Sequence, residues 1–148
     1  MSRGGFAEVR AEYEISNFRY QELKNFCLQY YEYKEKISEI ECAGNGKATY
    51  AQSGKSGSVH SDPVYKKAAE VGVYREYCEL IEQTAMAIGG DYGLQKAFLD
   101  NVTAELSYEI LRAWGTIPND TGGRPVVSKD LFYKLRRKFF CLLSEKKR

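Results

Sequence analysis

Two segments of this chain repeat their apolar residues at steps of three and four, and this repeat constrains the fold more than any other feature. The first segment lies within residues 17–42 and the second within residues 62–88. Such a stripe follows one face of an α-helix and is typical of coiled coils. The stripe residues are Leu23, Phe26, Tyr30, Tyr33, Ile37 and Ile40 in the first segment, and Val64, Val71, Tyr74, Cys78, Ile81, Ala85 and Ile88 in the second. Because stripes of this width need a partner, we predict an antiparallel coiled-coil hairpin that also self-associates.

Residues before and after the second segment indicate where its helix begins and ends. A polar stretch rich in Gly and Ser, residues 43–61, is predicted to be a mobile linker that folding does not require. Asp62 and Pro63 mark the start of the second helix, because Asp caps a free backbone N–H group and Pro is tolerated at the first helical position. Gly89 and Gly90 are expected to end that helix.

The remainder of the chain reads as a support helix, a short helix, a connector and a last helix. The two helices are expected over residues 92–102 and 107–115, the connector over residues 116–127, and the last helix from Ser128. This order is that of a helix-turn-helix unit, with the last helix in the recognition position. The connector is longer than the usual turn of three or four residues, so it predicts either a wing-like loop or a unit that no longer reads DNA.

These elements together predict an all-α fold of two domains. Residues 1–90 would hold an N-terminal arm and the helical hairpin, and residues 91–148 the helix-turn-helix-like unit. The arm itself, residues 2–16, is ambiguous. Val9, Ala11, Tyr13 and Ile15 alternate as in a strand, but the Ala and Glu residues of the arm favour a helix or an irregular segment.

The last helix separates charge from apolar residues. Ser128 is a suitable N-cap, and Asp130 lies where the helix dipole favours an anion. The predicted apolar stripe is Leu131, Phe132, Leu135, Phe139, Leu142 and Leu143. Residues 124–148 hold nine Lys or Arg against two acidic residues, a net charge of +7, whereas the whole chain carries +2. This asymmetry favours a polyanionic partner, although many basic helix faces are only solvated.

Several segments resemble small proteins of Firmicutes phages and prophages grouped with RinA/ArpU-type late-gene activators, whose C-terminal part is similar to sigma factor region 4. The segments are residues 20–30, 61–69, 101–103, 108–111 and 129–140. The resemblance implies a transcription regulator that binds double-stranded DNA through its last helix. By position, the expected DNA-binding residues are Lys129, Tyr133, Lys134, Arg136, Arg137 and Lys138, with Arg124 added from the connector.

Two other functions remain open. A phage-encoded inhibitor of a host defence protein, of the anti-CRISPR kind, or of host RNA polymerase would suit the Tyr-rich hairpin. A small subunit of a DNA-packaging machine would combine a helical unit with an oligomerising hairpin. For each of these functions, the predicted self-association of the hairpin makes a homo-oligomer the expected state, and the host cytoplasm is the expected location.

Composition argues against an enzyme and against a bound metal or cofactor. The four cysteines form no Cys-x-x-Cys pair, and the single histidine, His60, is expected in a loop. Cys27 and Cys78 lie on apolar stripes and are predicted to be buried. No apolar run is long enough for a membrane-spanning helix, and no signal peptide is evident at the N-terminus.

Overall fold

The computed structural model describes residues 15–51 and 57–147, with side chains described for residues 15–42 and 65–147. Helices make up most of this part of the chain, and its only bridge between extended residues joins Asn119 to Pro125. The predicted all-α fold is therefore confirmed. No helix among the described residues is long and apolar enough to cross a membrane. The expected N-terminal arm falls mainly on residues 1–14, outside the described part.

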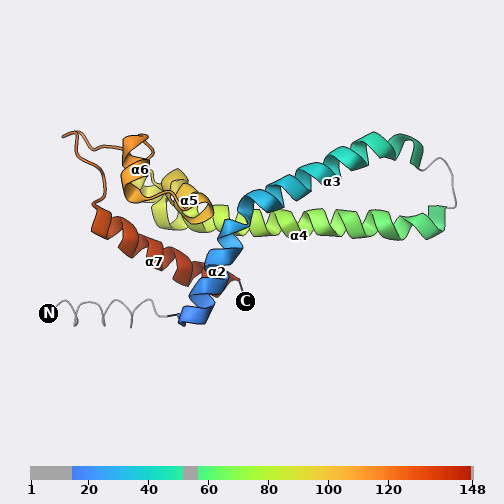
Figure 1. Cartoon of the computed structure of the whole chain (residues 1–148), viewed down its shortest axis with the longest axis horizontal. Helices are drawn as coiled ribbons and strands as arrows, with labels where there is room; N and C mark the ends of the chain where they lie inside the picture. The colour runs from blue at the N-terminus through green and yellow to red at the C-terminus, as the bar shows by residue number, and fades with distance from the viewer. Residues whose placement is uncertain (1–14, 52–56, 148) are drawn as a thin grey trace. The chain divides into compact units, whose positions relative to one another are not determined.

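Figure 1 shows the order of the helices. They are α2 (Asn17–Leu28), α3 (Tyr30–Ala51), α4 (Gly57–Gly89), the 3-10 helix η1 (Gly90–Tyr92), α5 (Gln95–Ala104), α6 (Tyr108–Ala113) and α7 (Lys129–Lys146). Two predicted N-caps are confirmed. The Ser128 hydroxyl accepts a hydrogen bond from the Leu131 N–H, and the Ser107 hydroxyl accepts one from the Ile110 N–H.

The first predicted helix is two helices. α2 ends at Leu28, and α3 begins at Tyr30. The Gln29 N–H donates to the Phe26 carbonyl, three residues back, at 3.3 Å. A bond to the third preceding residue tightens the turn and interrupts the α-helical ladder. The heptad spacing of the apolar residues continues across this break, so the sequence pattern did not reveal it.

The predicted mobile linker over residues 43–61 is largely wrong. Backbone residues 43–51 continue α3, and residues 57–61 belong to α4, so His60 is helical rather than in a loop. The part of the linker at residues 52–56 lies outside the described residues. Pro63 falls inside α4 instead of at its start. Once a helix has formed, each added residue needs only one more hydrogen bond, so a weakly favourable sequence can extend it.

The chain divides into two compact units that differ from the predicted domains. Unit 1 comprises residues 1–29 and 80–148, and unit 2 comprises residues 30–79. The boundary does not lie at residue 90, because α2 and the last turns of α4 belong with the C-terminal helices. One boundary coincides with the break at Gln29, and the other lies within the continuous helix α4.

Aromatic rings from α5, α6 and α7 form the core of unit 1. The rings of Phe98 and Phe132 stack with centroids 4.6 Å apart and an interplanar angle of 5°. The Tyr108 ring lies 5.6 Å from the Phe132 ring, and its hydroxyl donates to the Val127 carbonyl at 2.6 Å. Helix α2 covers this core, packing against α5 and α7 through the buried side chains of Leu23 and Phe26. All of these apolar contacts remove area from water and hold α7 in place.

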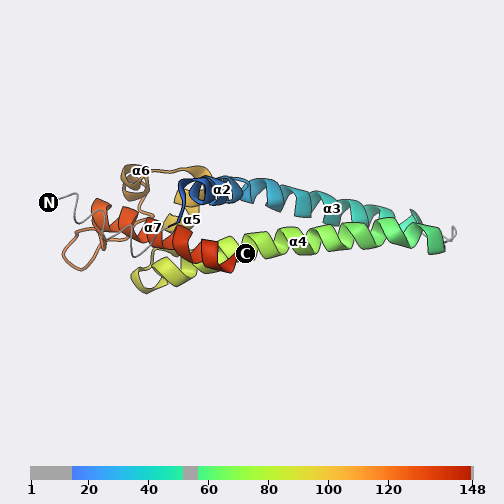
Figure 2. The same ribbon diagram turned by 90° about the horizontal axis from the view of Figure 1, so that it is seen from below.

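In unit 2, α3 runs antiparallel to the first part of α4 (Figure 2). The Cys78 thiol approaches the Tyr30 carbonyl at 4.0 Å, and the Tyr33 ring lies 5.7 Å from the Tyr74 ring. Farther along, Arg75 forms an ion pair with Glu41. Cys78 is buried, as predicted from its place in the stripe.

Gly89 permits a close approach at the end of α4. A Cβ atom built there would lie 2.7 Å from Cδ2 of Phe98 and 2.9 Å from the backbone carbon of Leu94. The Gly89 carbonyl also accepts a hydrogen bond from the Leu94 N–H at 2.7 Å. The side chain of Phe98 is fully buried, so it has little room to move away.

We expect Gly89→Ala to lower the free energy of unfolding by about 1–3 kcal/mol, because an added methyl group would strain a packed site. Gly72→Ala is the matched control, since nothing lies within 4 Å of a Cβ atom there. That exposed helical change should raise the free energy of unfolding by about 0.5–1 kcal/mol. Urea denaturation followed by circular dichroism measures both. Equal effects of the two changes would contradict the close approach at Gly89.

Candidate nucleic-acid interface

Helix α7 turns one face into the core of unit 1. Its buried residues are Phe132, Leu135, Phe139, Phe140 and Leu143. Leu131 and Leu142, which the sequence placed in the stripe, are only half-buried. The apolar face is therefore rotated toward Phe140 relative to the prediction. This rotation decides which basic residues face inward.

Arg136 is the basic residue that the rotation brings inside. Its Nε donates to Oδ1 of Asn101 on α5 at 2.6 Å, and its Nη1 donates to the Tyr20 hydroxyl on α2 at 2.9 Å. The guanidinium carbon also lies 4.9 Å from the centroid of the Phe140 ring. Asn101 is buried, and its amide nitrogen donates to the Leu106 carbonyl at 2.9 Å. One side chain of α7 thus binds both neighbouring helices, and its donors are directed into the protein rather than toward a ligand.

A second arginine fixes the far end of α7. Nε of Arg19 donates to the Ser144 hydroxyl at 3.0 Å, and its Nη2 donates to the Ser144 carbonyl at 3.1 Å and to the Lys147 carbonyl. The last carbonyls of a helix lack partners within the helix, and a cation there also suits the helix dipole. Arg19, from α2, therefore caps the C-terminus of α7. Together with Arg136, it defines how α7 is held.

Two further predicted DNA-binding residues are engaged with α6. The Tyr133 hydroxyl accepts a hydrogen bond from the Tyr108 N–H at 3.3 Å. Nζ of Lys129 lies 2.7 Å from a carboxylate oxygen of Glu109, and both side chains are exposed. Hydrogen bonding between them lowers the pKa of Glu109 and raises the pKa of Lys129. An exposed pair of this kind contributes little stability, so Lys129 can exchange partners readily.

Lys134 and Arg137 lie on the exposed face of α7, and Lys138 is half-buried beside it. Lys134 and Arg137 are on the side of the helix opposite the buried Phe139, and Lys138 is at the edge of that side. The structure thus brings Lys134 and Arg137 together on one outward surface, and separates them from Arg136. Asp130 and Glu145 are exposed toward the two ends of the helix, so its middle is the most basic part of this face.

The long connector between α6 and α7 is a small hairpin turn. Oδ1 of Asp120 accepts from the N–H groups of Gly122 and Arg124 at 2.8 and 3.0 Å, and the Asp120 N–H donates to the Arg124 carbonyl at 2.6 Å. Gly123 adopts a left-handed φ of 81°, which glycine tolerates without strain. The turn leaves the Arg124 side chain exposed, a few residues before α7 begins.

The structure also shows functional candidates that the sequence reading missed. Ile110 on α6 and Trp114, the C-cap residue that follows this helix, are 40% and 67% exposed, and Ala113 between them is exposed as well. Their spacing of three and four residues places them on one side of a short helix. The i, i+4 spacing of Ile110 and Trp114 was visible in the sequence, but only the structure shows that both side chains are exposed.

The arrangement offers cations on a firmly held helix. No group of three or more His, Cys, Asp or Glu residues within the described part of the chain could hold a metal ion. No protein-family model, no curated protein and no solved structure matches this chain. The geometry and charge of α7 therefore carry the functional proposal.

The four thiols should report this geometry by their reactivity. Burial raises the pKa of Cys27 to about 12, and the nearby charge of Arg136 opposes that shift only in part. Cys42 is exposed, and burial raises the pKa of the half-buried Cys141.

At pH 8 we expect Cys42 to react first with an aromatic disulfide reagent, Cys141 more slowly, and Cys27 and Cys78 only after unfolding, because the thiolate is the reactive form. Mass spectrometry of the labelled peptides measures the order. Early labelling of Cys27 would contradict the packing of α2 against α7.

Proposed function

We propose that this protein binds duplex DNA through the outer face of α7, as expected of the transcription regulators that its sequence resembles. The observation that carries the proposal is the division of α7 into two faces. Phe132, Phe139 and Phe140 hold the helix in the core, while Lys134 and Arg137 point away from it. A rigid, outward basic helix preceded by two helices has the order of a helix-turn-helix unit.

Most of the contacts would be made to phosphates. Lys134 and Arg137 lie on the exposed face, and Lys138 at its edge could reach a second strand. Lys129 can exchange Glu109 for a phosphate, and Arg124 on the hairpin turn could contact the backbone beside the helix. Such contacts position a protein on DNA, whereas base edges give sequence specificity. Arg136 and Tyr133 would act indirectly, by orienting α7.

A second candidate function is binding to another protein, and the exposed face of α6 favours it. Exposed aromatic and apolar residues that adjoin one another often mark protein–protein contact surfaces. Ile110 on α6 and the C-cap residue Trp114 form such a pair. A partner such as a host defence protein or RNA polymerase would then contact α6 rather than, or in addition to, the phosphates of DNA.

Duplex binding at several salt concentrations tests the first proposal. We expect the double variant Lys134→Ala/Arg137→Ala to bind a labelled mixed-sequence duplex more weakly in fluorescence anisotropy. The slope of log affinity against log salt should fall by about one unit for each lost phosphate contact. Exposed substitutions change stability by about 0.5 kcal/mol or less, so circular dichroism should show an unchanged fold.

Lys36→Ala is the matched control, because it removes an exposed cation from α3 in unit 2. This control should bind DNA as the parent does. If the parent does not bind duplex DNA at low salt, or the double variant keeps the parent's salt dependence, α7 is a solvated face and the α6 surface becomes the better candidate.

A further inference from the structure

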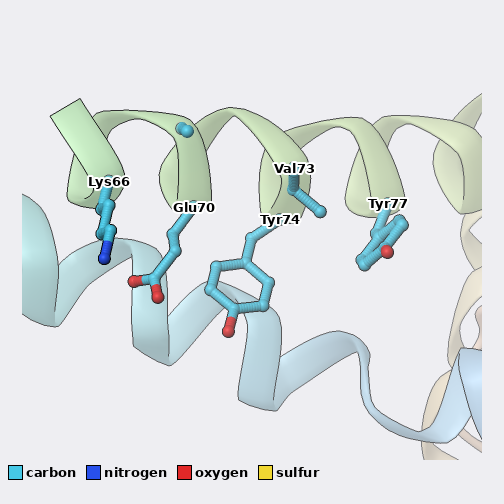
Figure 3. A pocket seen from close by; sticks show the side chains of 6 residues that line it. Lys66, Glu70, Val73, Tyr74 and Tyr77 are labelled. Carbon is cyan, nitrogen blue, oxygen red and sulfur yellow. The ribbon is translucent and has the colours of Figure 1, made fainter.

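Unit 2 has a groove along one side of α4, visible in Figure 3. Its volume is about 460 Å³, and every residue that lines it comes from α4. The lining residues are Lys66, Ala69, Glu70, Val73, Tyr74 and Tyr77. Their spacing of three and four residues places them on a single face of the helix. The groove is therefore a continuous surface of one helix rather than a collection of loop residues.

Helix α3 covers this face only in part. The Tyr33 ring from α3 approaches Tyr74 and Tyr77 at 5.7 and 5.1 Å. Val73 nevertheless remains 40% exposed, and Tyr65, which directly precedes the lining residue Lys66, is 74% exposed. Apolar and aromatic side chains outside the heptad stripe are thus left open to water beside the contact of α3 with α4, where a further helix can pack.

The charged side chains that line the groove, Lys66 and Glu70, indicate what kind of partner binds there. Lys66 and Glu70 lie one turn apart on the same face, and Figure 3 shows both pointing to the same side as Tyr74. Neither forms an ion pair with any described residue. Unit 2 as a whole carries eight acidic and seven basic residues, a net charge of −1. Two copies of this unit would therefore repel each other only weakly.

We propose that the groove is occupied by α4 of a second copy of this chain, in antiparallel orientation. A two-fold axis crossing α4 between Lys66 and Glu70 places the cation of each copy opposite the anion of its partner. One rotation makes both contacts, because a two-fold interface uses the same surface twice. The exposed Tyr65 and Val73 side chains flank this point and supply the apolar contact area. The self-complementary charges favour a second copy over an unrelated helix, which would need its own matching pattern.

Charge exchange tests this interface sharply. In sedimentation equilibrium, the parent should form dimers. In a dimer of the Lys66→Glu variant, position 66 of each copy and position 70 of its partner would both be anions. In a dimer of the Glu70→Lys variant, both would be cations. Each should raise the dimer dissociation constant at least roughly tenfold, because like charges opposed across an interface are costly. An equimolar mixture of the two variants should restore dimers, since each copy then meets the opposite charge on its partner.

Glu79→Lys is the matched control, because it makes the same change in charge at an exposed position of α4 that does not line the groove. The control should dimerise as the parent does. Rescue by mixing could not arise from misfolded variants, and circular dichroism of each variant checks the helix content. A parent that stays monomeric, single variants that dimerise normally, or a mixture that remains monomeric would each overturn the proposal. None of these substitutions lies on α7, so the outcome is independent of DNA binding.

Discussion

The guanidinium of Arg136 is the contact on which the arrangement of unit 1 depends most. It joins α7 to α5 through Asn101 and to α2 through Tyr20, with donor–acceptor distances of 2.6 and 2.9 Å. The planar guanidinium presents several donors in fixed directions, so one side chain can define the position of three helices. Without it, Asn101 would keep a buried carbonyl oxygen with no partner, which is costly in an apolar core. The aromatic packing beneath α7 supplies most of the buried area, and Arg136 selects the rotation of the helix.

That rotation determines what α7 can offer to a partner. Of the seven residues expected to bind DNA, Arg136 and Tyr133 face neighbouring helices and Lys129 is paired with Glu109. Lys134 and Arg137 are left on the outer face. If Arg136 also pointed outward, the outer face of α7 would be more basic, but the helix would be held less firmly to α5 and α2. The division of labour between neighbouring residues, Arg136 inward and Arg137 outward, therefore underlies both the fold of unit 1 and the proposed DNA contact.

Much of the fold could be predicted from the sequence because its signals are local. Ser107 and Ser128 cap helices as expected, and Cys27 and Cys78 are buried on their stripes. The interruption at Gln29 escaped prediction, because a single tightened turn leaves the spacing of side chains nearly unchanged. The helical backbone of residues 43–51 also escaped it, because Gly and Ser lower helix propensity without excluding a helix.

The candidate site was harder to predict, because the sequence does not show whether Phe140 is buried. Phe139 and Phe140 are adjacent, so the sequence alone allows the apolar face of α7 to centre on either side. Choosing the side of Leu131 and Leu142 leaves Arg136 at the edge of the solvent face. Burial of Phe140 instead turns Arg136 toward Asn101 and Tyr20. These partners lie 35 and 116 residues away in the chain, and no pattern in a single sequence relates residues at such distances.

A double-mutant cycle between Asn101 and Arg136 tests the central claim most directly. Urea denaturation would give the free energy of unfolding of the parent, Asn101→Ala, Arg136→Ala and the double variant. If Arg136 is bound internally as described, the two changes should be non-additive by about 1–3 kcal/mol. The same cycle with Arg137 in place of Arg136 should be additive within about 0.5 kcal/mol. Additivity for Asn101 and Arg136 would show that Arg136 does not hold α7 to α5, and would contradict the account.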